Sequence, residues 1–460
     1  MASVVETAMP DFDLIIIGAG PAGTAAAIEA TGRGLSVLVL DENPAPGGRI
    51  WQALESRDVK DADDAAGLAQ LREFRRCPAV VHYRATVWAI EPDATVFWTS
   101  DGAARSARAG QILLATGTTE RPMPIPGWTL PGVMTVGAAQ IALKTGGLVP
   151  EGAVWLAGQG PLLLLYAVQV LRAGGRFAGI LDLSDPAARG PALRHVPGAL
   201  FAWRDLAKGV AWRREIARSG IPWLRASGLR ADGDGALARI RFVAGGQDRT
   251  EAATMLLLHD GVMPSVQMSR ALGCAHEWNA AQRSWRPVVD RWGRTSLPHV
   301  LVAGDGAGIG GALAAAVSGR IAALAAAQEA GRIDIAARNS AAELLFARRD
   351  RLVAARPLLD TLYAPVVPGL DDATIVCRCE EVTAGQIREA ATLGCLGLNQ
   401  LKAFTRSGMG PCQGRMCGAA AADVMAQARG VLVPEVEPYR PRFPTKPVTV
   451  GELAALADAG

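Results

Sequence analysis

Residues 13–42 read DLIIIGAGPAGTAAAIEATGRGLSVLVLDE, and this stretch decides the fold of the first part of the chain. An apolar run from Leu14 to Ile17 predicts a buried strand that ends in a glycine-rich turn. An Ala-rich helix and a second apolar strand, Ser36 to Leu40, follow and end in two acidic residues. Strand, GxGxxG turn, helix, strand and acid in this order are typical of a dinucleotide-binding βαβ unit.

Each residue of the turn has a physical task. Gly18 makes the tight turn, Gly20 lets the backbone approach a pyrophosphate, and Gly23 lets the helix pack closely on the strand. The free N–H groups of the helix N-terminus favour phosphates. Asp41 stands where a carboxylate accepts the ribose hydroxyls and disfavours a 2′-phosphate. A glycine-rich turn without a ligand would explain the glycines, but it would not explain the acid.

Two later segments indicate FAD rather than NAD at this site. ILLATGTTERPMPIPG, residues 112–127, places a strand before Thr116-Gly117, and TSLPHVLVAGDGAGIGG, residues 295–311, places another before Gly304-Asp305. These motifs resemble those of two-dinucleotide-domain flavoproteins of the glutathione-reductase and thioredoxin-reductase type. The resemblance implies that the aspartate hydrogen-bonds the ribityl chain, although Asp305 would equally serve as a helix N-cap. It also implies that the loop PAPGGRIW, residues 44–51, crosses the FAD.

The motifs and this resemblance together predict one set of FAD-binding residues. They are Gly18, Gly20, Pro21, Ala22, Gly23, Asp41, Glu42, Gly47, Gly48, Arg49, Val87, Ala115, Thr116, Gly117, Gly304, Asp305, Gly311 and Ala312.

A second strand–turn–helix begins at Val154 and resembles the first with one defect. Gly158-Gln159-Gly160 leads into an apolar helix, and the next strand ends at Asp182, but Leu163 replaces the third glycine. The leucine side chain is expected to push helix and strand apart or to force a different approach of the helix, which disfavours the usual NAD pose. NAD or ATP binding is one alternative for this second domain, and a structural or regulatory nucleotide site is the other. The apolar run of residues 153–171 is interrupted by this turn, so we expect a buried element rather than a membrane span.

Four of the seven cysteines form two tight pairs near the C-terminus, in CRCEEV (residues 377–382) and GPCQGRMC (residues 410–417). We predict that Cys377, Cys379, Cys412 and Cys417 are metal ligands. Thr383 is the expected N-cap of a helix after the first pair, and a second helix follows Cys417. Four thiolates in one small module suit a [2Fe–2S] cluster or Zn²⁺. Two CxxC knuckles, as in a zinc ribbon, are not present.

The other three cysteines and the five histidines are predicted to be structural. No CxxC pair provides a redox dithiol, Cys77 and Cys274 stand alone, and Cys395 is expected in the core. No convincing acid/base pair for amine oxidation is found. His259 is the best histidine candidate for a place near the FAD.

The cysteine pattern resembles the [2Fe–2S] domain of bacterioferritin-associated ferredoxins, although the second pair here is CxxxxC rather than CxxC. Over nearly its whole length the chain resembles the A or alpha subunits of heteromeric FAD-dependent amino-acid dehydrogenases, a family that includes opine oxidase, hydrogen cyanide synthase and D-hydroxyproline dehydrogenase. The most specific segments are DENPAPGGRI, LLLHDGVMPS, ALGCAHEWNAAQRSWRPVVDRWGRTS, VAGDGAGIGGA and the cysteine pairs.

This resemblance implies an electron-transfer role. A partner flavoprotein subunit of the D-amino-acid-oxidase type would oxidise the C–N bond. Electrons would then pass to the FAD and the [2Fe–2S] cluster of this chain, and from there to a downstream acceptor. Some relatives hold FMN at the subunit junction and a small iron–sulfur subunit. Opines, D-hydroxyproline, proline and glycine all stay open as substrates, because their pocket would lie on the partner. The alternatives are a stand-alone NADH-dependent oxidoreductase and an assembly scaffold with vestigial cofactor sites.

Composition is ordinary for a soluble globular protein. A net charge of +3 over 460 residues, without a basic block, does not suggest nucleic-acid binding. The N-terminus lacks the features of a signal peptide, so a cytoplasmic location is expected, with association to the inner face of the membrane through the complex as an alternative.

The predicted fold class is α/β, a two-dinucleotide-domain flavoprotein with a small, mainly α [2Fe–2S] domain at the C-terminus. The predicted divisions are 1–150 (first FAD part), 151–264 (second nucleotide domain), 265–335 (second FAD part), 336–373 (helical connector), 374–430 (the cysteine module) and 431–460 (Pro-rich extension).

Overall fold

The computed structural model describes residues 11–59, 61–366 and 369–457. Its first sheet is built around the βαβ unit predicted from residues 13–42, in the order β3-β2-β1-β6-β5-β4, with β19 paired to β6. The strands of this sheet are β1 (Phe12–Ile17), β2 (Val37–Asp41), β3 (Val80–Tyr83), β4 (Thr86–Ile90), β5 (Thr95–Ser100), β6 (Ala103–Leu114) and β19 (Val300–Val302). Strands β3, β2, β1, β6 and β19 are parallel, and β4 and β5 extend the sheet as an antiparallel meander.

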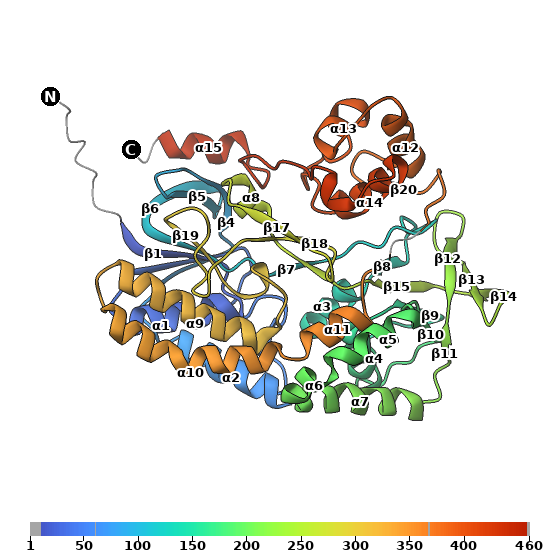
Figure 1. Ribbon diagram of the computed structural model, residues 1–460, viewed down its shortest axis with the longest axis horizontal. Helices are drawn as coiled ribbons and strands as arrows, with labels where there is room; N and C mark the ends of the chain where they lie inside the picture. The colour runs from blue at the N-terminus through green and yellow to red at the C-terminus, as the bar shows by residue number, and fades with distance from the viewer. Residues whose placement is uncertain (1–10, 60, 367–368, 458–460) are drawn as a thin grey trace.

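The alternation of side chains along β1 distributes its residues to two cores. Leu14 and Ile16 pack against helices, whereas Ile15 and Ile17 pack under the meander. The helices of this part are α1 (Pro21–Gly32), α2 (Ala62–Phe74), α9 (Ala312–Glu329) and α10 (Ile335–Val353). Figure 1 shows α1, α9 and α10 stacked below the sheet. The return of β19 to this sheet confirms that distant segments of the chain build one layer.

The second sheet is entirely parallel, in the order β11-β10-β9-β15-β8. Its strands are β8 (Val133–Thr135), β9 (Val154–Gly158), β10 (Gly179–Asp182), β11 (Trp223–Arg225) and β15 (Met255–His259). The helices around it are α3 (Val136–Gly146), α4 (Pro161–Arg172), α5 (Arg189–Ala192), α6 (Val196–Ala199), α7 (Trp203–Arg218) and α11 (Arg356–Leu362). An antiparallel sheet of β12 (Ser227–Asp232), β13 (Arg239–Ala244) and β14 (Gln247–Ala252) packs beside it.

The second sheet corrects one predicted boundary. Because β8 pairs with β15, this layer begins before residue 151. A strand of three residues is too short to show an alternating pattern, and α3 follows it directly. Leu163 is accommodated within the core beside Val154 and Leu257, so its side chain does not separate α4 from the sheet.

Short elements join the two sheets. Strand β7 (Thr118–Glu120) pairs with β16 (Val262–Pro264), helix α8 (Gln267–Ala271) follows, and β17 (His276–Asn279) pairs with β18 (Ser284–Pro287).

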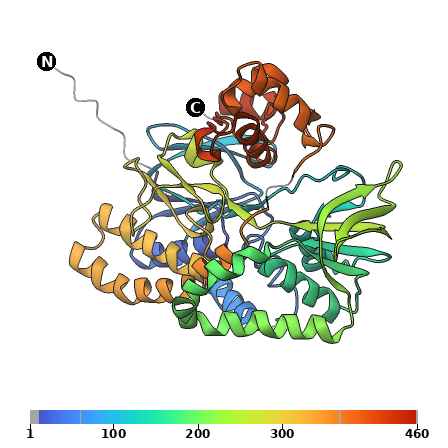
Figure 2. The same cartoon turned by 45° about the vertical axis from the view of Figure 1, so that its right-hand side comes forward.

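The cysteine module has its own hydrophobic core, in which Cys377, Cys395 and Cys417 are buried. Its elements are β20 (Ile375–Cys377), β21 (Val382–Thr383), α12 (Ala384–Thr392), α13 (Leu398–Thr405) and α14 (Gly418–Arg429). Thr383 is the N-cap of α12, as predicted, and forms a capping box with Gln386. Figures 1 and 2 show the module above the rest of the molecule.

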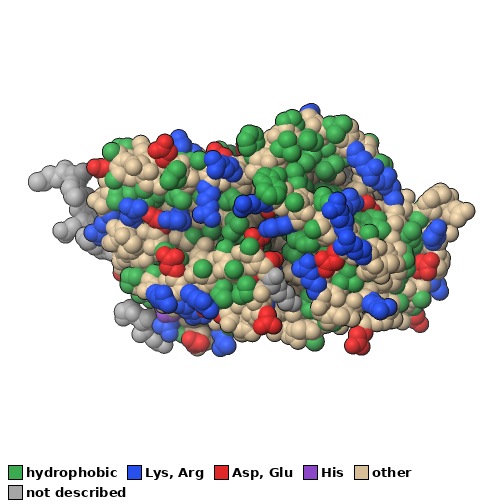
Figure 3. Space-filling view, turned by 90° about the horizontal axis from the view of Figure 1, so that it is seen from below, with side chains coloured by type: hydrophobic (Ala, Val, Ile, Leu, Met, Phe, Trp, Pro, Cys, Tyr) green, Lys and Arg blue, Asp and Glu red, His purple; other side chains and the backbone are tan. Residues whose placement is uncertain are grey.

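The C-terminal extension runs across the first sheet and ends in α15 (Val450–Ala457). Phe443, Val448 and Leu456 pack against a cluster that contains Trp88. Within the described residues, no helix is long and apolar enough to cross a bilayer. On the face shown in Figure 3, Lys and Arg side chains are spread among acidic and hydrophobic ones.

Candidate functional site

The first glycine turn, between β1 and α1, has the close contacts that require glycine. Gly18 has φ of +108°, and a Cβ atom there would lie 2.5 Å from the carbonyl oxygen of Ala115. A Cβ atom on Gly23 would lie 1.8 Å from the carbonyl oxygen of Gly18. Any side chain at these positions would displace the helix, so the turn keeps the N-terminus of α1 at the edge of the sheet.

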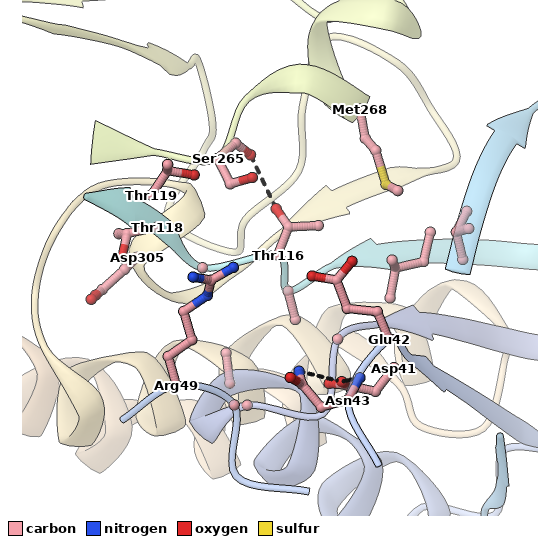
Figure 4. Close-up of a pocket in the computed structure, with 18 of the residues that line it drawn as sticks. Asp41, Glu42, Asn43, Arg49, Thr116, Thr118, Thr119, Ser265, Met268 and Asp305 are labelled. Carbon is pink, nitrogen blue, oxygen red and sulfur yellow. Dashed lines mark hydrogen bonds between the residues drawn. The ribbon is translucent and has the colours of Figure 1, made fainter. Parts of the chain in front are cut away.

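A cavity opens at this turn, and we call it the cofactor cavity. It is lined by fourteen of the predicted binding residues: Gly18, Gly20, Pro21, Ala22, Asp41, Glu42, Gly48, Arg49, Val87, Ala115, Thr116, Gly117, Asp305 and Ala312. Figure 4 shows Asp305 on one side, Asp41 and Glu42 on the other, and Arg49 between them. The structure therefore brings three separated sequence motifs to one cavity.

The acidic end of the cofactor cavity is held by backbone and side-chain donors. The Asp41 carboxylate accepts hydrogen bonds from the backbone N–H of Ala19 at 2.5 Å and from both the backbone and side-chain amides of Asn43 at 2.7 Å. Burial raises the pKa of the Asp41 carboxyl, and these hydrogen bonds only partly oppose it. The three hydrogen bonds fix the orientation of this carboxyl.

Glu42, the next residue, is controlled by the C-terminal part of the chain. Its carboxylate accepts a hydrogen bond from Lys446 Nζ at 2.7 Å. Burial by itself raises the pKa of the Glu42 carboxyl. The hydrogen bond and charge of Lys446, together with the charges of Arg49 and Arg415, outweigh that effect and hold the pKa below its usual range.

Asp305 organises the loop that leads into α9. Its Oδ1 atom accepts hydrogen bonds from the backbone N–H groups of Gly310 and Gly311, both at 2.9 Å. Burial raises the pKa of this carboxyl, and the two hydrogen bonds oppose that effect. The aspartate thus caps the loop and also lines the cofactor cavity.

Four predicted binding residues lie outside the lining and shape the backbone instead. Besides Gly23, these are Gly47, Gly304 and Gly311, which have φ of +115°, +72° and +90°. The backbone N–H of Gly47 donates to the carbonyl oxygen of Ala19 at 2.8 Å, which ties the crossing loop to the first turn.

Several lining residues were not predicted from the sequence. They are Ile17, Leu40, Asn43, Ile50, Ala85, Thr118, Thr119, Ser265, Gln267, Met268, Ala303, Ala315, Arg415, Thr445 and Lys446. Arg415 and the last two belong to the cysteine module and the C-terminal extension. No local motif marks them, because only the folding of the extension across the first sheet brings them to the cavity.

The four predicted metal ligands lie together as two pairs. The Sγ atoms of Cys379 and Cys412 are 3.8 Å apart, and the thiols of Cys377 and Cys417 hydrogen-bond to one another. That hydrogen bond, with backbone donors and despite burial, lowers the pKa of the Cys377 thiol to about 5. A Cβ atom on Gly410 would lie 2.2 Å from Cys379 Cβ. The loop that contains Gly410 therefore approaches Cys379 as closely as a glycine allows.

This arrangement can be compared with metal coordination geometry. Two thiolates bound to one tetrahedral metal at about 2.3 Å are separated by about 3.8 Å, which the Cys379–Cys412 pair matches. Among the described residues, no three Cys, His, Asp or Glu side chains are arranged to hold one metal ion. The four thiols together equal the number of sulfur ligands that a [2Fe–2S] cluster or a structural zinc ion takes.

His259 lies at the second glycine turn instead of in the cofactor cavity. Its Nδ1 atom is 2.6 Å from Glu120 Oε1, and Glu120 also accepts from the backbone N–H of Gly137. The expected place near the FAD is therefore wrong, since β15 belongs to the second sheet.

The chain itself covers the second glycine turn with residues 363–366, which we call the cover segment. Gln159 Nε2 donates to the carbonyl oxygen of Ala364 at 2.7 Å, and the backbone N–H of Val366 donates to Asp260 Oδ1 at 3.1 Å. Burial raises the pKa of the Tyr363 hydroxyl, which lies within electrostatic range of Asp182. The cover segment thus contacts the residues that follow the carboxyl ends of β9 and β15, the edge at which such folds bind nucleotides.

We expect that NAD⁺ does not bind to this chain and that NADH does not reduce its flavin. Residues 363–366 already lie on the strand ends that a dinucleotide would contact. Titration calorimetry with NAD⁺ and anaerobic stopped-flow mixing with NADH measure both properties. The same two measurements on a Gln159→Ala variant, which loses the contact to Ala364, serve as the comparison. Stoichiometric binding of NAD⁺ to the unaltered chain would contradict the expectation.

Comparison with known proteins agrees with this geometry. The family model of pyridine nucleotide-disulphide oxidoreductases matches residues 12–145, and that of the sarcosine oxidase A3 domain matches residues 372–457. The fold resembles L-proline dehydrogenase from P. horikoshii, with a TM-score of 0.70, 19% identity and coverage of 96% of this chain and 79% of that chain. It also resembles thioredoxin reductase from T. acidophilum, with a TM-score of 0.51 and 19% identity over 70% of this chain and 99% of that one. The chain thus has the fold of the pyridine nucleotide-disulphide oxidoreductases, and the match to this family model supports FAD as its cofactor.

The sequence relatives identify the family. The chain is 44% identical to the A subunit of opine oxidase from Agrobacterium tumefaciens over 98% of its length and 93% of that protein. It is 33% identical to the HcnB subunit of hydrogen cyanide synthase from Pseudomonas aeruginosa over 94% of its length and 96% of that protein. The alpha subunit of sarcosine oxidase from Rhizobium meliloti is 27% identical over 96% of this chain and 42% of that protein. The chain belongs to the family of the opine oxidase A subunits, as the sequence motifs predicted, and its relatives are subunits of heteromeric flavoenzymes.

Proposed function

We propose that this chain is the FAD and [2Fe–2S] electron-transfer subunit of a heteromeric dehydrogenase that oxidises the C–N bond of an amino acid, imino acid or opine. A D-amino-acid-oxidase-type flavoprotein subunit oxidises the substrate, and a downstream acceptor takes the electrons. The similarity to the A subunit of opine oxidase favours an opine as the substrate of the complex. The family resemblance further suggests an FMN at the subunit junction and a small iron–sulfur subunit.

The observation that supports this proposal is that the loop between two of the predicted cluster ligands reaches the cofactor cavity. Arg415 lies between Cys412 and Cys417 in the sequence, and it lines the cofactor cavity. FAD accepts two electrons as a hydride and a [2Fe–2S] cluster transfers one at a time, so a chain with both can divide an electron pair. Asp41, Asp305 and the glycine-rich turns that begin at Gly18 and at Gly304 would hold the FAD. The four thiolates would hold the cluster.

The lining of the cofactor cavity supports oxidation of the substrate on another chain. Of the described residues that form this lining, none is His, Tyr or Cys. The three carboxylates there, Asp41, Glu42 and Asp305, are engaged with backbone donors or with Lys446. Hydrogen bonds within the chain thus already hold each of these carboxylates.

The proposal is tested by determining iron and acid-labile sulfide per FAD in anaerobically purified protein. We expect two of each per FAD and an electron paramagnetic resonance signal of a reduced cluster after dithionite addition. The same preparation, alone, should not oxidise opines or amino acids, and adding the partner subunit should restore the reaction. Full substrate oxidation by the isolated chain would contradict the division of labour, and a stoichiometric zinc content would contradict the electron-transfer role.

A further inference from the structure

The loop between Cys412 and Cys417 is the place where the cysteine module contacts the cofactor cavity. Both the backbone N–H and the side-chain Nε of Arg415 donate to the carbonyl oxygen of Cys412, at 3.1 and 3.2 Å. The guanidinium group is therefore oriented by the backbone of a predicted cluster ligand. The same residue lines the cofactor cavity and influences Glu42 at its acidic end.

A second connection runs through residues 443–446, which we call the C-terminal strap. Gln413 Nε2 donates to the carbonyl oxygen of Pro444 at 2.5 Å. The next residue, Thr445, donates its backbone N–H to the carbonyl oxygen of Trp88 at 2.8 Å, and Lys446 reaches Glu42. Thr445 and Lys446 both line the cofactor cavity. The loop thus reaches the cavity wall in two ways. Arg415 lines the cavity directly, and Gln413 contacts the C-terminal strap, which lines the cavity in turn.

The shape of this loop depends on tight packing rather than on regular secondary structure. Residues 411–417 form turns, and Gln413 has a positive φ of 48°. A Cβ atom on Gly414 would lie 2.3 Å from the ring of Tyr439. A metal centre that holds Cys412 beside Cys379 would close the loop by a cross-link, whereas free thiols leave this closure to weak contacts. Filling the centre should therefore fix the position of Arg415.

We propose that occupancy of the cysteine centre and FAD binding are thermodynamically linked, with Arg415 as a positioning residue of the FAD site and the C-terminal strap as the second connection. The inference rests on the proposed pair of cofactors. A filled centre holds the loop in the conformation that presents Arg415, Thr445 and Lys446 to the cavity. Linkage is reciprocal, so bound FAD also stabilises the centre against loss of its metal.

The test compares FAD affinity in two forms of the full chain. One form carries its cluster, and the other is emptied either by a chelator or by the Cys379→Ser substitution. Fluorescence titration with FAD gives the dissociation constant of each form. We expect the emptied forms to bind FAD about 10-fold more weakly, within the range of couplings between sites. A Gln413→Ala/Arg415→Ala double variant should bind FAD equally in both forms, because both connections are removed.

Arg378→Ala provides the matched control. Arg378 also lies between two ligands of the centre, but its guanidinium stacks over Trp128 and it is outside the cofactor cavity. This variant should keep the difference of about 10-fold. Equal FAD affinity of the loaded and emptied natural chain would overturn the proposal, and so would an undiminished difference in the double variant.

Metal analysis before the titration separates this proposal from the function proposed above. Iron with equal affinities in the two forms would reject the linkage alone. Zinc in place of iron would reject the electron-transfer role, and the same titration on zinc-loaded and zinc-free protein would still decide the linkage. A centre that holds no metal would reject both.

Discussion

Replacement of Cys379 or Cys412 by Ser is expected to abolish the cluster and leave a yellow protein that still binds FAD. The two Sγ atoms lie 3.8 Å apart, so they would bind the same iron. Iron content should fall from two per chain to near zero, and the paramagnetic signal after reduction should disappear. Transfer of electrons from the partner to an artificial acceptor should be lost in the same preparation.

Cys395→Ser is the matched control for this prediction. Cys395 is a buried thiol of the same module, and its Sγ donates to the carbonyl oxygen of Gly397 at 3.4 Å rather than to another thiol. Its replacement should leave iron content and the spectrum unchanged, because a hydroxyl can keep the same hydrogen bond. Equal iron content in the Cys379→Ser and Cys395→Ser proteins would show that the pairs are not the ligands.

Gly319→Ala is expected to lower the free energy of unfolding by about 3 kcal/mol and to weaken FAD binding strongly. Gly319 lies inside α9, where it packs on α1, and a Cβ atom there would lie 2.0 Å from the carbonyl oxygen of Ala22. One of the two helices must shift, and Ala22 itself lines the cofactor cavity. Urea unfolding gives the change in stability, and gel filtration followed by absorbance gives the FAD that remains bound.

The contrasting substitution is Gly32→Ala in α1. Apart from its chain neighbours and the backbone of its own helix, no heavy atom lies within 4 Å of the position that its Cβ would take. Since alanine is the better helix former, this change should be neutral or stabilise the protein by up to about 1 kcal/mol. If both substitutions had the same effect, helix propensity and not the contact between α1 and α9 would explain the role of Gly319.

The glycine turns show why part of the site was predictable. A strand, a turn and a helix are adjacent in sequence, and the close contact between Gly18 and Gly23 is made within the same unit. The acid at Asp41 follows at the end of the neighbouring strand. Both the need for glycine in the turn and the position of the carboxylate can therefore be predicted from residues that are close together in the sequence. The helices beside the cysteine pairs were predictable for the same reason, since Thr383 caps its own helix.

The boundary before residue 151 and the place of His259 were not predictable in this way. Both depend on β15 lying between β9 and β8, a pairing of segments that are far apart in the chain. The cover segment is a further case. Gln159 and Ala364 are separated by 205 residues and meet through one amide–carbonyl hydrogen bond, for which no sequence pattern exists.

Two dinucleotide-type folds, an acid at the end of the second strand of the first one, and four cysteines in two pairs could all be read from the sequence. These features arise from short-range spacing, in which turn geometry and strand periodicity demand particular residues. Only the tertiary structure decided that Arg415 and Lys446 complete the first cavity and that the chain covers its own second site. Those contacts result from packing of the C-terminal extension and the connector against distant surfaces. The free energy of that packing comes from burial of side chains such as Phe443 against the first sheet, which local sequence does not encode.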